Sequence, residues 1–155
     1  MIRSVLAAAA LVVATATPAS ADPTGYFIWD SDPDAWPTAG HSGTWYQPDL
    51  FSVHEFPEKR NQIRIYGETP GGGQDYLSIE LWRNDGQRIG EGHYTDQPVR
   101  VVYWSYGWVD EGADFDVEHI AYDADGRIRE FDGAVEHHYR DQPDTTFRAK
   151  ISYRR

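Results

Sequence analysis

The chain has 155 residues, no cysteine and a formal net charge of −11 at pH 7, with 25 acidic residues against 14 Lys and Arg. The lack of cysteine excludes disulfides, thiolate metal sites and cysteine-based catalysis. A nucleic-acid-binding surface needs clustered Lys and Arg, and the sequence has no basic run longer than a pair such as the final Arg154-Arg155. We therefore expect no nucleic acid partner and no affinity for anionic membranes.

The chain opens with the pattern of a secretory signal peptide. Arg3 gives a short positive end, residues 5–16 form an Ala-rich apolar run, and Ala19-Ser20-Ala21 matches an A-x-A cleavage site. The run is too short for a membrane anchor. The pattern predicts a cleaved signal peptide over 1–21 and a mature domain over 22–155. We expect that domain to have no transmembrane anchor and to be secreted, to the extracellular medium or the cell surface.

The mature part alternates apolar and polar residues, and no long segment has a convincing helical period. Turn signals rich in Gly, Pro and Asp separate the alternating segments. We expect strands at Tyr26–Trp29, Leu50–Phe56, Gln62–Gly67, Tyr76–Trp82, Val99–Tyr106, Phe115–Tyr122, Arg127–Tyr139 and Thr146–Tyr153. The pattern predicts an all-β fold, a single-domain antiparallel β-sandwich of about eight strands.

The segment after the first expected strand begins like a calcium loop, because Asp30, Asp32 and Asp34 occupy alternate positions. An EF-hand loop needs glycine at its sixth position and glutamate at its twelfth. Ala35 and His41 stand there instead. Turn formation explains the Asp and Pro residues, so we expect no metal site and no cofactor. A calcium-stabilised structural module stays an alternative.

Aromatic residues crowd the segment YWSYGW at 103–108. If it is extended, Trp104 and Tyr106 share one face of the strand. Exposed flat rings beside carboxylates can stack on sugar rings and accept hydrogen bonds from their hydroxyls. The alternative is a thick aromatic core. The expected ligand-binding residues are Trp104, Tyr106 and Trp108, with Asp110 and Glu111 as neighbouring acids.

The turn at 123–126 sets a register for the strands on either side of it. It fits a type I turn closed by a glycine bulge, with its first residue facing Arg127. In that register His119 lies opposite Phe131 on a largely apolar face. We therefore expect His119 to point inward.

The segment VEHHYRD at 135–141 resembles a metal site or an acid–base pair. On a strand, however, His137 turns inward while Glu136 and His138 turn outward, so the two histidines cannot bind one ion. The last strand returns with Glu136 opposite Arg148. We expect that pair to form an exposed cross-strand ion pair.

Acidic residues gather on these strands: Asp114, Asp116, Glu118, Asp132 and Glu136. The predicted register sets Asp114 opposite Glu136. It also sets Glu118 opposite Asp132. Like charges directly opposite each other are destabilising, so arginines of the last strand or a cation should compensate, and we favour the arginines.

Hydrolysis is the enzymatic alternative. Glu118 and Glu136, helped by His138, could serve as paired carboxylates of a small glycan hydrolase. No nucleophile elbow and no HExxH motif occurs in the sequence. We expect no catalytic residue.

Four stretches resemble a family of bacterial secreted single-domain β-sandwich proteins of unknown activity: SDPDAWPTAGHSGTW (31–45), GEGHYTD (90–96), FDVEHIAYDADGRIREFDGAVEHH (115–138) and FRAKISY (147–153). The resemblance implies export and the same fold, in accessory modules that are sometimes attached to larger surface or hydrolytic proteins. In that family a cysteine that pairs with an earlier one usually follows the Glu-x-His motif. Tyr139 occupies that position here.

Together these observations predict a secreted, non-catalytic binding or cell-envelope-associated module. Carbohydrate is the leading ligand class, and extracellular polysaccharide or cell envelope is the expected partner.

Overall fold

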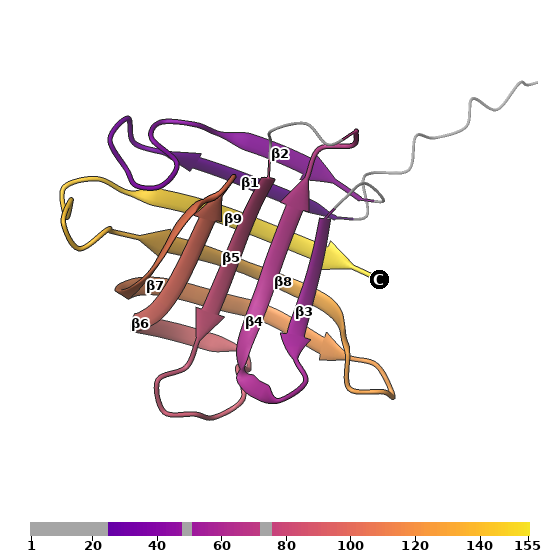
Figure 1. Ribbon diagram of the computed structural model, residues 1–155. Coiled ribbons are helices and arrows are strands. Elements are labelled where there is room, and N and C mark those ends of the chain that lie inside the picture. Colours follow the sequence, from indigo (N-terminus) through magenta and orange to yellow (C-terminus); the bar gives the residue numbers. More distant parts are fainter. Residues whose placement is uncertain (1–24, 48–50, 72–75) are drawn as a thin grey trace, which may run out of the picture.

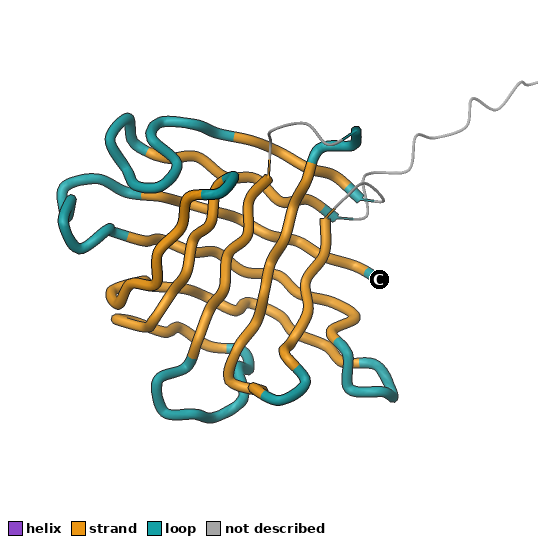
Figure 2. Tube along the Cα trace, in the orientation of Figure 1, coloured by secondary structure: helices purple, strands orange, loops and turns teal. Residues whose placement is uncertain are grey.

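The computed structural model describes residues 25–47, 51–71 and 76–155, and the predicted signal peptide lies outside them. The strands are β1 (Tyr26–Ser31), β2 (Gly43–Tyr46), β3 (Phe51–Phe56), β4 (Lys59–Glu68), β5 (Tyr76–Trp82), β6 (Gly92–Tyr103), β7 (Tyr106–Tyr122), β8 (Ile128–His137) and β9 (Phe147–Arg154). The described ranges contain no helix, so none that could span a membrane (Figures 1 and 2). The predicted all-β antiparallel fold is confirmed.

All nine strands belong to one sheet in the order β2-β1-β9-β8-β7-β6-β5-β4-β3. Every neighbouring pair is antiparallel, and most neighbours are also consecutive in sequence. The sheet bends until it is nearly closed as a barrel, so that β3 to β5 cross β8 and β9 in Figure 1. Figure 2 shows the loops at the ends of the strands.

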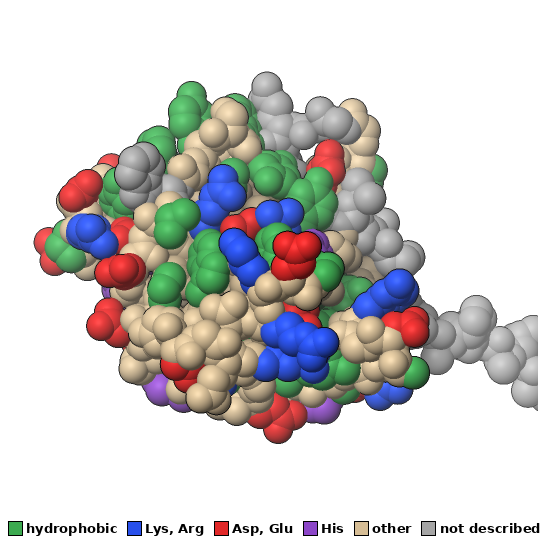
Figure 3. Space-filling view, turned by 60° about the horizontal axis from the view of Figure 1, so that its bottom comes forward, with side chains coloured by type: hydrophobic (Ala, Val, Ile, Leu, Met, Phe, Trp, Pro, Cys, Tyr) green, Lys and Arg blue, Asp and Glu red, His purple; other side chains and the backbone are tan. Residues whose placement is uncertain are grey.

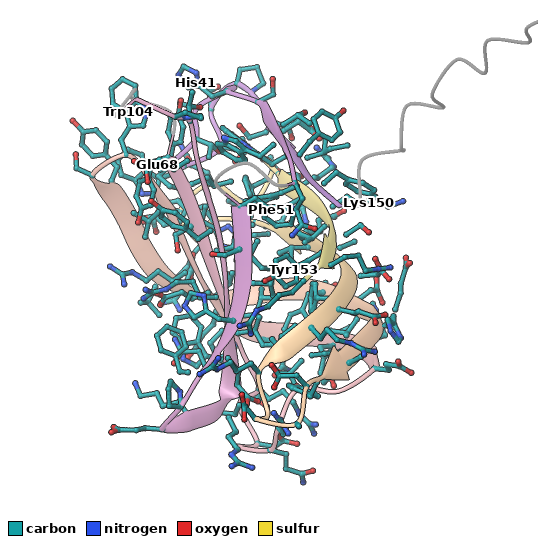
Figure 4. All side chains as sticks on the ribbon, turned by 90° about the vertical axis from the view of Figure 1, so that its right-hand side faces the viewer. His41, Phe51, Glu68, Trp104, Lys150 and Tyr153 are labelled. Atoms are coloured by element: carbon teal, nitrogen blue, oxygen red, sulfur yellow. The ribbon has the colours of Figure 1, made fainter. Side chains whose placement is uncertain are left out.

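Side chains connect the two open edges of the sheet. Phe51 on β3 contacts Phe27 on β1, with ring centroids 5.7 Å apart, and Tyr153 on β9, at 5.6 Å. Trp45 on β2 covers Gly67 on β4 so closely that a Cβ atom there would lie 2.5 Å from the indole. Figure 4 labels Phe51 and Tyr153 on this side of the molecule. Among the residues that the structure describes, packing rather than strand pairing therefore brings the edges together.

The core lies inside the bent sheet and is built from the inward-facing residues of the alternating segments. The largest fully buried side chains are Phe27, Ile63, Ile65, Leu77, Ile79, Leu81, Ile89, Phe115, Ile128, Phe131, Phe147 and Ile151. Each contributes about 1.5–3 kcal/mol by leaving water. This core stabilises the fold without disulfides.

The predicted register of the last three strands is confirmed over most of its length. Phe115 pairs with Val135 on β8, and His137 pairs with Phe147 on β9. His137 is buried, while the neighbouring His138 is partly exposed. The two histidines therefore do not share an ion.

One part of that register was wrong. β7 bulges between Val117 and His119, so His119 pairs with Asp132, and Glu118 has no direct partner on β8. His119 consequently lies on the outer surface, 3.2 Å from Glu130 and 3.1 Å from Glu91. The prediction that His119 points inward was therefore wrong. The predicted like-charge pair of Glu118 with Asp132 does not form either. The sequence held a signal for this bulge, because the core-facing residues change from odd positions at Phe115 and Val117 to even positions at Ile120 and Tyr122.

Several strand predictions also need correction. The segment Gly43–Tyr46 forms a short strand, β2, that was not predicted. The expected strand Val99–Tyr106 begins earlier, at Gly92, and ends at Tyr103, where the chain turns. The next strand, β7, begins at Tyr106 and continues through the expected strand Phe115–Tyr122. A turn at this place was missed because the segment lacks the Gly or Asn that usually marks a two-residue hairpin loop.

Candidate functional site

The β6–β7 hairpin presents two of the predicted ligand-binding residues. Tyr103 pairs with Tyr106, which leaves Trp104 and Ser105 as its two-residue loop. Trp104 has a φ of 56°, a conformation that favours glycine and costs a bulky residue about 1–2 kcal/mol. The Trp104 side chain is nevertheless 39% exposed. An exposed, strained tryptophan at a loop tip suggests a role outside the core.

The loop between β1 and β2 brings a second exposed tryptophan to this hairpin. Trp36 meets Tyr106 edge to face, with ring centroids 5.7 Å apart. His41, from the same loop, packs on Tyr103 at 5.2 Å. We call the exposed rings of Trp36, His41, Trp104 and Tyr106 the aromatic rim. Figure 4 shows Trp104 and His41 together at one end of the molecule.

Buried rings support the aromatic rim from below. Tyr103 is 7% exposed and contacts Trp104 at 5.7 Å and Trp29 at 5.4 Å, measured between ring centroids. The loop that carries His41 is held by Ser31, whose hydroxyl donates to the carbonyl oxygen of His41 at 3.1 Å. The rim is therefore anchored to the core.

The acids near the rim differ from those that the sequence indicated. Asp110 is 4% exposed and accepts hydrogen bonds from the backbone N–H groups of Glu111 and Arg140, at 2.8 and 2.7 Å. It is therefore an internal structural residue. Glu68 lies closer to the rim, because its pairing partner Tyr76 accepts a hydrogen bond from the Trp104 N–H. Figure 4 labels Glu68 and Trp104 toward the same end.

A tyrosine holds the Glu68 carboxylate in place. The hydroxyl of Tyr66 donates a hydrogen bond to it. This bond, together with burial, raises the pKa of Tyr66 to about 12. Tyr66 consequently stays protonated as a donor, and Glu68 keeps its remaining acceptor positions for other partners.

The structure brings two of the three predicted binding residues together. Trp104 and Tyr106 both lie in the aromatic rim, but as parts of a turn and a strand start rather than as one face of a strand. The backbone of Trp108 pairs with Val101, and its side chain lies outside the described part of the chain. The sequence analysis did not identify Trp36 as a binding residue. Its position among Asp and Pro residues that are typical of a turn was the available sign that it lies on a surface loop.

Two of the three candidate calcium residues, Asp30 and Asp32, are occupied by protein contacts. Asp32 accepts a hydrogen bond from the Thr146 N–H at 2.9 Å, and Arg148 lies 3.4 Å from Asp32 and 3.8 Å from Asp30. Asp34 is exposed. Within the described ranges, no group of three or more His, Asp or Glu side chains could hold a metal ion.

The same contacts correct the expected pair of Glu136 with Arg148. These residues are opposite each other as predicted, but Arg148 turns toward β1, and Glu136 lies 3.1 Å from His138 instead.

The two carboxylates of the enzymatic alternative, Glu118 and Glu136, are far apart along the sheet. Glu136 pairs with Asp114, four residues before Glu118 on β7. The backbones of Glu118 and Glu136 are therefore about 13 Å apart. This separation disfavours a glycosidase site, in which the two carboxylates lie about 5–9.5 Å apart.

No family model, no curated protein and no solved structure matches the chain. Its own geometry and chemistry must therefore indicate its function.

Proposed function

We propose that the protein is a secreted, non-catalytic binding module whose aromatic rim binds extracellular polysaccharide or cell envelope. One observation carries this proposal: three large side chains, Trp36, Trp104 and Tyr106, are 38%, 39% and 56% exposed at one end of the molecule. A folded domain that fills its core with other aromatic residues does not need these three at its surface. Clustered exposed rings are typical of recognition surfaces.

The chemistry of the rim suits carbohydrate. A sugar ring offers an apolar face of C–H groups and an edge of hydroxyls, and flat aromatic rings complement the face. Glu68 supplies acceptor oxygens for the hydroxyls beside Trp104. Because Trp36 and Tyr106 meet at 70°, the rim presents rings in different planes. This arrangement favours several units of a polymer over one sugar.

Retention on insoluble material tests the proposal. The mature protein would be incubated with a panel of insoluble polysaccharides and with purified cell envelope, and the bound fraction measured after washing. We expect retention on at least one material, and a loss of at least about tenfold in affinity in Trp104→Ala and Tyr106→Ala. Tyr46→Ala is the matched control, because Tyr46 is 47% exposed on β2 and does not belong to the rim.

Two results would contradict this function. If both rim variants bound every retaining material as the parent does, the rim would not be the binding surface. If the protein hydrolysed a glycan, and Glu136→Gln abolished turnover while the fold remained intact, the enzymatic alternative would replace it. Secretion has its own test: the mass of the exported protein should correspond to a chain that starts at Asp22.

A further inference from the structure

A cleft of about 440 Å³ lies along the seam of the bent sheet, between its last strand and the strands that it crosses. Residues 52–55 of β3 line one wall of this cleft. Residues 125–128, from the β7–β8 turn and the start of β8, line the other wall together with Tyr153 and Arg155 of the C-terminal segment. We call it the seam cleft. Its volume is within the range of ligand sites.

The free edge of β3 faces the seam cleft. Side chains on a strand alternate between its two faces, so four consecutive residues line one cleft when it runs along the edge of their strand. β3 is the last strand of the sheet and pairs only with β4. Among the described residues, no hydrogen bond joins the backbone of residues 52–55 to any other segment. The N–H and C=O groups that point away from β4 are therefore available to a further strand, along an edge about 13 Å long.

A tyrosine on the opposite wall supplies a hydroxyl without a partner. Tyr153 is 7% exposed, and its ring packs edge to face on Phe51. Its hydroxyl makes no hydrogen bond with the described residues, yet it does not belong to the polar atoms that are enclosed away from solvent. Since Tyr153 lines the seam cleft, this oxygen opens into it (Figure 4 labels Tyr153 on this side of the molecule). Buried tyrosines usually bond their hydroxyl, so this group is a ready donor to a carbonyl or carboxylate in the cleft.

Arginines give the seam cleft its charge. Four arginines line it against two carboxylates: Arg60, Arg88, Arg127 and Arg155 against Glu55 and Asp125. Arg88 is already paired with Glu55, with both of its nitrogen–oxygen distances at 2.7 Å. The side chains of Arg60 and Arg127, in contrast, have no ion pair and no hydrogen bond with the described residues. Two unpaired guanidinium groups beside one cleft favour an acidic ligand.

The two unpaired arginines stand on different walls. Arg60 lies near the start of β4, and Arg127 lies in the β7–β8 turn. Figure 3 shows several Lys and Arg side chains on the face that carries the β3–β4 and β7–β8 turns. A segment that runs along β3 passes between these walls. Its side chains point alternately to its two faces, so acidic ones can reach both arginines.

We propose that the seam cleft binds an acidic, extended polypeptide segment, which adds to the free edge of β3 as a further strand. Main-chain hydrogen bonds to residues 52–55 hold the segment, and its acidic side chains pair with Arg60 and Arg127. A carbonyl or carboxylate oxygen of the segment accepts a hydrogen bond from the Tyr153 hydroxyl. In strand addition the main chain supplies affinity and the side chains supply specificity. This site is separate from the aromatic rim and does not depend on the function proposed for the rim.

Titration of the mature protein with a synthetic peptide tests the inference. The probe is a capped peptide of about seven alternating Glu and Val residues, which carries a fluorophore and is followed by anisotropy. We expect saturable binding. The same peptide methylated at every backbone nitrogen keeps the charges but cannot donate to β3, so it should bind at least about tenfold more weakly. A peptide of alternating Lys and Val should lose at least as much affinity.

Two further measurements locate the binding. Hydrogen exchange followed by NMR should slow at backbone amides of residues 52–55 when the Glu and Val peptide is bound. Arg60→Gln combined with Arg127→Gln should weaken its binding about three- to tenfold. Arg129→Gln combined with Arg148→Gln is the matched control, because it removes two arginines outside the seam cleft, and it should bind as the parent does.

Several results would overturn the proposal. No saturable binding, or equal binding of the methylated peptide, would exclude strand addition. Equal affinity of the parent and the Arg60 and Arg127 double variant would exclude the pairing with these arginines. Free glutamate that bound as tightly as the peptide would make this a site for small anions, and self-association that the double variant lost would make a second copy of the chain the occupant. Because Trp104 and Tyr106 are intact in all these variants, none of these results bears on the aromatic rim.

Discussion

The indole of Trp36 meets the phenol ring of Tyr106 edge to face, at 5.7 Å between centroids and 70° between planes, and so joins the β1–β2 loop to the β6–β7 hairpin. Aromatic pairs of this geometry contribute about 0.5–1.5 kcal/mol beyond their burial. In a double-mutant cycle of Trp36→Leu and Tyr106→Leu, urea unfolding should give a coupling energy in that range. Additive losses would mean that the two segments are independent.

The positive φ of Trp104 leads to a prediction about its replacements. Trp104→Gly and Trp104→Ala both remove the ring, but only glycine adopts a φ of 56° without strain. The glycine variant should therefore be more stable than the alanine variant by about 1 kcal/mol in chemical denaturation. At Ser105, which does not have a positive φ, the order should reverse.

Stability should fall in mildly acidic solution because of His137. Burial lowers the pKa of His137 below its usual 6.5, and nearby Asp110 opposes this only in part. The unfolded chain therefore binds the proton more readily, so the stabilisation is complete above pH 6.5 and is lost as the pH falls through the folded pKa. His137→Leu should flatten the plot of unfolding free energy against pH in this window.

At alkaline pH the same variant should unfold with nearly the parent free energy, because neither ring nitrogen of His137 has a hydrogen-bond partner among the described residues. Burial also lowers the pKa of His54, so His54→Gln should remove a further part of the slope. An unchanged slope in the double variant would contradict the assignment.

A second pH effect should arise from Asp132. Arg154 donates two hydrogen bonds to its carboxylate, at 2.9 and 2.6 Å. Burial alone would raise the pKa of Asp132, but the hydrogen bonds from Arg154 and Ser152 outweigh it and hold the pKa below the usual 3.8. The resulting stability is present above pH 3.8 and is lost as the pH falls through the folded pKa.

Asp132→Asn should therefore lower the unfolding free energy by about 1–3 kcal/mol at neutral pH. The gap between the variant and the parent should close on acidification, when the parent carboxyl is protonated as well. Thermal unfolding at a series of pH values measures this. A gap that stayed constant down to strongly acidic pH would show that packing, rather than charge, is responsible.

Sequence patterns predicted much of the fold because they depend on local chemistry. The alternation of apolar and polar residues in β8 and β9, together with the turns at their ends, predicted the register in which His137 faces Phe147. It also predicted that the buried His137 and its neighbour His138 point to opposite faces of the sheet. Strand Tyr76–Trp82 was predicted at its observed bounds for the same reason. In these segments one face of the strand is buried in the core and the other is exposed to water, so apolar and polar residues alternate along the sequence.

Tertiary structure decided what residue order does not record. The turn at Trp104 and the meeting of Trp36 with Tyr106 depend on how the sheet bends. The seam cleft exists only because the bent sheet brings the free edge of β3 to the β7–β8 turn. The sequence by itself determined which side chains are apolar and how they alternate, and this was enough for an antiparallel sheet. The closure of that sheet decided which distant side chains became neighbours, because their contacts depend on the relative positions of whole strands.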